Sequence, residues 1–67
     1  NASVLLHMLD VIDVIGQEAK APEARQQLLR HVSLILAESQ AGELIEQDRH
    51  TIALRGQDIQ AKLTGAV

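Results

Sequence analysis

Hydrophobic residues recur at helical spacing in three segments, of which the first, from Ser3 to about Lys20, is the most apolar. Ser3 is a suitable N-cap, because its hydroxyl can accept a hydrogen bond from the free N–H groups of the first turn. At 100° per residue, the main apolar arc covers roughly 160°. The arc contains Val4, Leu5, Met8, Leu9, Val11, Ile12 and Ile15. We predict a helix that packs this arc, except for one edge of it, against the rest of the fold. Gly16 weakens the helix near its end by roughly 1 kcal/mol relative to Ala.

Two apolar side chains of this segment, Leu6 and Val14, fall outside the main arc. They lie among polar positions: His7, Asp10, Asp13, Gln17 and Glu18. The predicted helix is therefore apolar on more than one side.

The only proline, Pro22, separates the first segment from the second. Proline disfavours helical geometry at Ala21 and suits the first turn of a new helix, where Glu23 favours the positive helix start. We predict a tight turn and then a helix over residues 22–41 that ends at Gly42. Its apolar stripe consists of Leu28, Leu29, Val32, Ile35 and Leu36. The short connection makes the first two helices antiparallel neighbours.

The third segment carries a narrow apolar stripe of coiled-coil width. The stripe consists of Ile52, Gly56, Ile59 and Leu63. We predict a helix over about residues 48–64, with Asp48 as its N-cap. Asp58 and Lys62 stand one turn apart and form a pair worth about 0.2–0.5 kcal/mol.

Two features of this region allow more than one interpretation. Residues 43–47 are either a connection or an early helical turn, so the second and third helices are either separate or continuous. Gly56 either lets another helix approach closely or is a tolerated surface glycine, and we favour the close approach.

The length of 67 residues allows one domain, which we assign to residues 3–67. The Asn1-Ala2 pair is typical of the remnant of an expression tag, so we expect a fragment of a longer protein. A chain this short buries only about 60% of the surface that its unfolded form exposes, and without Cys it has no disulfides. We therefore predict an all-α fold, a small bundle of three helices (a helical hairpin plus a third helix) completed by self-association.

Composition excludes several classes of function. The net charge is −3, and the six Lys and Arg residues are dispersed, which argues against nucleic acid as a partner. Phe, Tyr and Trp are absent, so base-stacking sites and aromatic cages are excluded. No apolar run approaches the length of about 18 residues that spans a membrane.

The candidate catalytic and metal-binding residues lack the required patterns. His7, His31 and His50 lie on three different segments, whereas metal ligands on one helix usually stand four residues apart. Asp10 and Asp13 are helical neighbours, but catalytic carboxylates need a pocket that shifts their pKa values, and we favour a solvated face. We expect no enzyme activity, no cofactor, no metal and no small-molecule substrate.

Several short motifs resemble a known family. They are Val4-Leu5-Leu6, Leu9-Asp10, Ile12, Pro22-Glu23-Ala24-Arg25, Leu28-Leu29-Arg30-His31, Leu34-Ile35, Asp48-Arg49, Ile52 and Arg55. Over nearly the whole chain they resemble the C-terminal tail of an uncharacterised family of predicted bacterial membrane proteins, the domain of unknown function family numbered twenty-two fifty-four. The resemblance implies a full-length protein in the bacterial inner membrane, with this segment soluble and cytoplasmic, and it implies no activity. The family tends to have a proline before the Asp-Arg pair, which residues 43–47 lack.

These patterns predict a non-catalytic helical packing and self-association module. We expect a homodimer with the first helix at the contact, although the parent protein is an alternative partner for the same surface. Apolar residues off the main stripes are assigned to this contact: Leu6, Val14, Leu34 and Leu54. The alternative function is a free-standing regulatory module that presents a groove to a partner helix.

Overall fold

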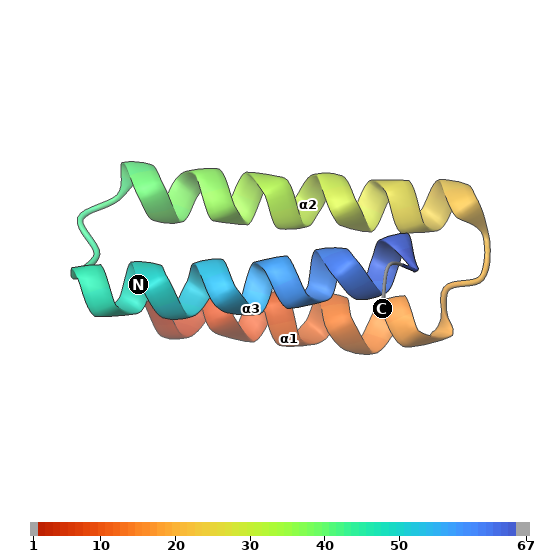
Figure 1. Cartoon of the computed structure of the whole chain (residues 1–67), viewed down its shortest axis with the longest axis horizontal. Helices are drawn as coiled ribbons and strands as arrows, with labels where there is room; N and C mark the ends of the chain where they lie inside the picture. Colours follow the sequence, from red (N-terminus) through yellow and green to blue (C-terminus); the bar gives the residue numbers. More distant parts are fainter. Residues whose placement is uncertain (1, 66–67) are drawn as a thin grey trace.

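The computed structural model describes residues 2–65, which form three helices and contain no strand (Figure 1). The helices are α1 (Ala2–Glu18), α2 (Pro22–Ala41) and α3 (Glu46–Thr64). Successive helices run in opposite directions along a body of 35 × 19 × 16 Å (Figure 1). The predicted all-α bundle of a hairpin plus a third helix is confirmed. Asn1, half of the expected tag remnant, lies outside the described residues, as do residues 66–67.

Proline and glycine set helix boundaries where the sequence indicates them. Pro22 is the first residue of α2 and follows Ala21, whose backbone is extended with φ −70° and ψ 133°. Gly65 ends α3 in the left-handed region at φ 74°, and its N–H donates to the carbonyls of Ala61 and Lys62. Each residue takes the backbone geometry that its chemistry favours, since proline restricts the residue before it and glycine tolerates positive φ.

The predicted ends of α1 are each displaced by one or two residues. The helix begins at Ala2, so Ser3 lies inside its first turn instead of capping it. It ends at Glu18, two residues before the predicted end at Lys20. Differences of this size are common, because helix ends fray and methods of assigning helices differ by one or two residues at each end.

The predicted N-cap of α3 is wrong. The helix follows Ile45, whose backbone is extended, and Asp48 lies inside the first turn. The partly buried Leu44 packs against the core directly before this point, so the chain enters the bundle earlier than the sequence indicates. The non-helical stretch before Glu46 also resolves the open alternative, because α2 and α3 are separate helices.

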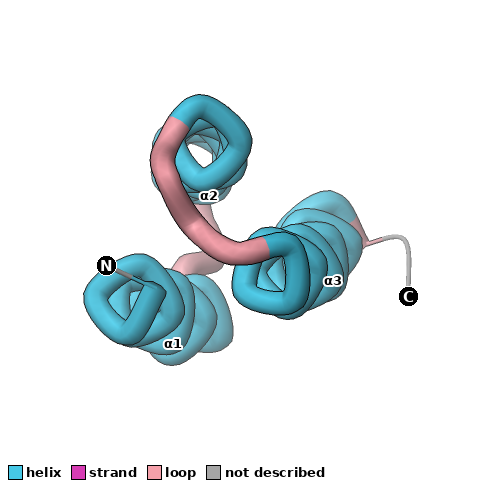
Figure 2. Tube along the Cα trace, turned by 90° about the vertical axis from the view of Figure 1, so that its left-hand side faces the viewer, coloured by secondary structure: helices cyan, strands magenta, loops and turns pink. Residues whose placement is uncertain are grey.

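One stripe from each helix meets at the centre of the triangle that the three helices form in end view (Figure 2). The core is wholly aliphatic: Leu5, Leu9, Ile12, Val32, Ile35, Ile52, Ile59 and Leu63. Leu28, Leu29 and Leu36 are partly buried against it, so the predicted stripe of α2 is confirmed. Ser39 is also buried, and its hydroxyl donates to the Leu36 carbonyl at 2.7 Å, which satisfies the only polar atom of its side chain.

The core-facing arc of α1 has the uncovered edge that the sequence predicts, but this edge is wider than expected. Leu5, Leu9 and Ile12 are buried, but the other members of the arc are exposed: Val4, Met8, Val11 and Ile15. Leu6, which was expected outside the core, is half-buried and packs against it. The buried side of α1 includes Gly16, which lies against Leu63 of α3, and Asp13, which forms ion pairs with Arg55 and Lys62 of α3.

Two glycines allow close helix approach. A Cβ added at Gly56 would lie 2.5 Å from Leu36 Cδ2, and one added at Gly16 would lie 2.8 Å from Leu63 Cδ2. Real Cβ atoms essentially never come so close. The favoured interpretation of Gly56, a close approach between helices, is confirmed.

Candidate functional site

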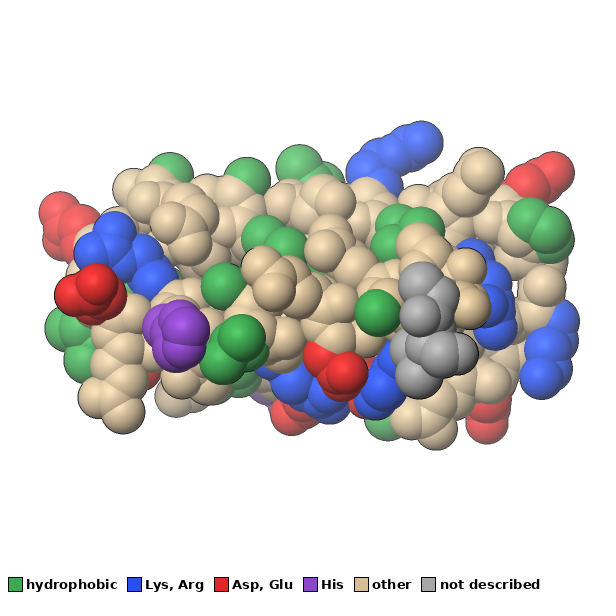
Figure 3. Space-filling view, viewed as in Figure 1, with side chains coloured by type: hydrophobic (Ala, Val, Ile, Leu, Met, Phe, Trp, Pro, Cys, Tyr) green, Lys and Arg blue, Asp and Glu red, His purple; other side chains and the backbone are tan. Residues whose placement is uncertain are grey.

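Acidic and basic side chains gather along the edge where α3 meets α1 (Figure 3). Arg55 Nη2 lies 3.0 Å from Asp13 Oδ2 and 3.2 Å from Asp10 Oδ1. Arg55 Nη1 lies 3.3 Å from Asp58 Oδ2. Lys62 Nζ lies 3.3 Å from Asp58 Oδ2, as the sequence predicts, and 3.6 Å from Asp13 Oδ2. Two cations of α3 therefore bind carboxylates of both helices.

Asp13 is the most buried member of this cluster. Its side chain is 11% exposed, against 62% for Asp10, so the expectation of a solvated face is wrong for Asp13. A carboxylate is tolerated there because Arg55 and Lys62 neutralise it. The hydrogen bond between Arg55 and Asp13 is the main cause that raises the pKa of Arg55 above its ordinary value. Arginine is always charged in proteins, so the cluster is an electrostatic link between α1 and α3.

The histidines do not converge with these carboxylates on a metal site. Within residues 2–65, no group of three or more His, Cys, Asp or Glu side chains is placed to hold a metal ion. His7 and His31 line one groove, whereas His50 lies at a different one. The expected lack of metal binding stays a prediction for experiment.

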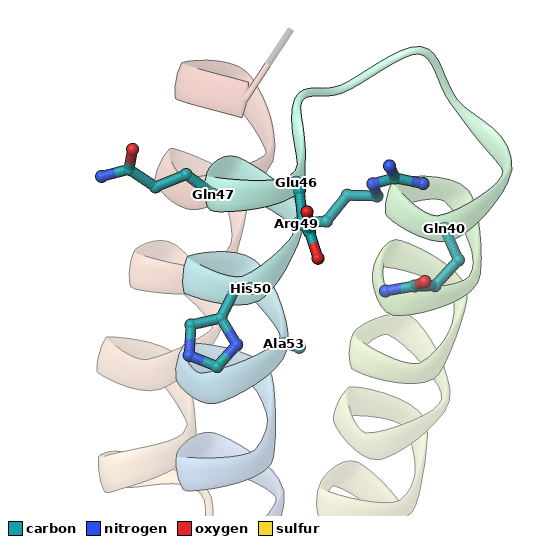
Figure 4. Close-up of a pocket in the computed structure, with 6 residues that line it drawn as sticks. All are labelled: Gln40, Glu46, Gln47, Arg49, His50 and Ala53. Carbon is teal, nitrogen blue, oxygen red and sulfur yellow. The ribbon is translucent and has the colours of Figure 1, made fainter.

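An open polar depression lies between the end of α2 and the start of α3 (Figure 4). It is lined by Gln40, Glu46, Gln47, Arg49, His50 and Ala53. Arg49 extends toward α2, while Gln47 and His50 point away from α2 (Figure 4). Because these side chains do not converge, the depression offers no arrangement for positioning a reactant.

A second depression, here called the α1/α2 groove, is apolar. It has a volume of about 470 Å³ and lies between α1 and α2. It is lined by His7, Met8, Val11, Ile12, His31, Leu34, Ile35 and Glu38. In end view α1 and α2 both lie to the left of α3 (Figure 2), and this pair is the least closely packed of the three. Ion pairs hold α1 to α3, and the close contact at Gly56 joins α2 to α3. Between α1 and α2 the described residues form neither an ion pair nor a contact as close as that at Gly56.

The exposed side of α1 extends the groove. Val4, Met8, Val11 and Ile15, here called the outer stripe, are 43–54% exposed. Each lies one position before or after a buried or half-buried residue, so the outer stripe runs parallel to the core stripe, about 100° around the helix. α1 therefore has two apolar faces, of which the bundle covers one.

The structure separates the four residues that the sequence assigns to self-association. Leu34 lines the α1/α2 groove, and Val14 lies beside the outer stripe in a shallow depression with His7 and Val11. Leu54 is exposed on α3 and does not line the groove. Leu6 packs against the core, so it is not available to a partner in the way expected. Self-association itself stays a prediction.

Two stabilising side chains were not anticipated as such from the sequence. Asp13 follows Leu9 by four residues and precedes Gly16 by three, so its place on the core stripe was a usable signal for a buried, paired carboxylate. Arg25 donates from Nε to the Ala19 carbonyl at 2.9 Å and from Nη1 to the Leu63 carbonyl at 3.2 Å. No local pattern indicates this second contact, because it joins residues 38 positions apart.

Comparisons of the chain with protein-family models, curated proteins and solved structures found no match. Among the described helices, none is both long and apolar enough to cross a membrane. Function is therefore inferred from the residues themselves, and the α1/α2 groove with the outer stripe is the candidate site.

Proposed function

We propose that this chain is a non-catalytic helical module that acts by self-association through the α1/α2 groove and the outer stripe. The observation that carries this proposal is the outer stripe beside the apolar groove. A small monomer rarely leaves a connected apolar surface of this kind without a use. A second copy is the simplest occupant, because two-fold dimers are the commonest oligomers.

The exposed side chains set the expected strength of the dimer. Full burial of one large aliphatic side chain is worth roughly 1.5–3 kcal/mol, so covering the remaining half contributes about 1 kcal/mol. The outer stripe and Leu34 supply five such side chains to each protomer, or about 10 kcal/mol per dimer. With a cost of association of about 4 kcal/mol, the low end of the general range, about 6 kcal/mol remains, which corresponds to a Kd on the order of tens of micromolar.

The resemblance extends the proposal to the cellular setting. There the chain is the C-terminal tail of a bacterial inner-membrane protein, on its cytoplasmic side, and the same face brings two parent chains together or packs against the parent. A second candidate function is a free-standing module that binds the helix of another protein. The groove favours it specifically, because aliphatic grooves with Met8 at the rim suit amphipathic helices.

Light scattering after size exclusion tests the proposal over concentrations from about 10 µM to about 1 mM, which bracket the expected Kd. The informative variant is Val11→Glu, because Val11 belongs to both the groove and the outer stripe. Leu6→Glu is unsuitable, since Leu6 supports the core. Leu54→Glu is the matched control: Leu54 is also exposed, but belongs to α3 and does not line the groove.

We expect the wild type and Leu54→Glu to dimerise with rising concentration and Val11→Glu to remain monomeric with unchanged helix content. A buried carboxylate without a partner is strongly unfavourable, which is why one charge suffices. A wild type that is monomeric and folded at about 1 mM would overturn the proposal, because that concentration exceeds the expected Kd. Undiminished dimerisation of Val11→Glu would overturn the assignment to this face.

A further inference from the structure

The outer stripe has a spacing that is the same in both chain directions. Its members Val4, Met8, Val11 and Ile15 are separated by four, three and four residues. This is the spacing of a coiled-coil seam. Because the intervals are palindromic, a second α1 running antiparallel presents the same pattern, with position 4 opposite 15 and position 8 opposite 11.

The next position of the seam distinguishes antiparallel from parallel pairing. Three residues after Ile15 stands Glu18, an exposed acid at the last residue of α1. In a parallel pair the two Glu18 carboxylates would face each other. In an antiparallel pair each lies beside the start of the partner helix, where backbone N–H groups carry partial positive charge.

The charges at the ends of α1 favour the same arrangement. The first turn of α1 contains no acidic residue and the last turn contains no basic residue. Within the described residues, α1 therefore has no charged side chain in its first or last turn that compensates the helix dipole. An antiparallel partner supplies the missing acid at the first turn, which makes the charges of the two copies complementary.

We propose that two copies of this chain pair through antiparallel α1 helices about a two-fold axis, with Val4 opposite Ile15 and Met8 opposite Val11 of the other copy. This pairing rests on the proposed self-association. A dimer of standard size covers about 800 Å² on each partner, which is about one sixth of the 4633 Å² accessible surface of this chain. α1 is about 26 Å long, so a contact along it, with Leu34 beside it, extends over most of the 35 Å length of the molecule.

Disulfide trapping tests this register cleanly, because the wild-type chain has no cysteine. Val4→Cys and Ile15→Cys replace half-exposed residues, so both variants should fold. One variant carries an affinity tag, which gives the mixed dimer its own mass. Each variant is oxidised alone and as an equimolar mixture, and the products are separated without reductant. Leu54→Cys, on α3, is the control for random collision.

Antiparallel pairing predicts a disulfide dimer in the mixture of the two variants and only background cross-linking in each variant alone. The reason is distance: two copies of position 4 lie about 16 Å apart in that register, whereas a disulfide needs Cα atoms within about 7 Å. In the chain without added cysteines, Glu18→Lys should weaken dimerisation roughly threefold or more relative to the wild type, since each copy loses one contact with a helix start.

Three results would overturn this pairing. Strong cross-linking of each variant with itself would indicate parallel helices. A dimer in light scattering without any cross-link above the Leu54→Cys background would place the contact elsewhere while leaving self-association intact. A chain that stays monomeric in light scattering removes both proposals together.

Discussion

Asp13 and Asp10 provide a matched pair of substitutions for the ion-pair cluster. Asp13→Asn and Asp10→Asn each remove one charge at nearly constant shape, and both residues contact the same Arg55 nitrogen. They differ in burial, because the Asp13 side chain is 11% exposed and that of Asp10 is 62% exposed, and Asp13 has a second ion pair, with Lys62. The free energy of unfolding should therefore fall much more for Asp13→Asn.

The expected magnitudes follow from the surroundings of each carboxylate. Exposed ion pairs contribute about 0.2–1 kcal/mol, which is the range expected for Asp10. Breaking a fully buried pair costs about 3–5 kcal/mol, but Arg55 and Lys62 are 32% and 44% exposed, so solvent screens the Asp13 pairs. We expect about 2 kcal/mol for Asp13→Asn, which corresponds to a fall in Tm of about 8–16 °C in a domain of this size.

Thermal and urea unfolding followed by far-UV circular dichroism measure both variants. Protein concentration is held constant, because dimerisation would add to the apparent stability. A constant urea m-value would confirm that only stability has changed. High salt at about 1 M should reduce the Asp10 effect more than the Asp13 effect, since exposed charges are screened more completely. Equal losses for the two variants, or a loss below about 0.5 kcal/mol for Asp13→Asn, would refute the reasoning from burial.

Two further predictions concern the close helix approaches and the histidines. Gly56→Ala should destabilise by about 1 kcal/mol, because overpacking against the whole Leu36 side chain exceeds the gain in helix propensity. Gly16→Ala should be neutral or stabilising, since only the Cδ2 tip of Leu63 must move. Urea unfolding measures the stability of both variants, and a larger loss for Gly16→Ala than for Gly56→Ala would contradict this account. Zinc should leave Tm unchanged within about a degree, whereas a large saturable rise would identify a site that the histidines form.

The sequence by itself determined the three helical segments, but the structure was needed to show that the second and third are separate helices. Pro22 and Gly65 act on the backbone of their own and neighbouring residues, so their effects are visible locally and the structure agrees with them. The stripe of α3 is also local, because its buried residues recur at intervals of four, three and four residues. Gly56 stands within that stripe, which is why its close approach could be inferred without knowing that Leu36 is the contact.

Only the tertiary structure decided which face of α1 is buried. The helix is apolar over more than half of its circumference, so periodicity alone fits several rotations about its axis. Leu6 and Asp13 turn inward and Val4 turns outward because α3 provides Arg55 for the carboxylate. Arg55 is 42 residues away from Asp13 in the sequence, so no local pattern predicts their contact. The candidate self-association surface is the consequence, since it consists of the apolar side of α1 that the chosen rotation leaves uncovered.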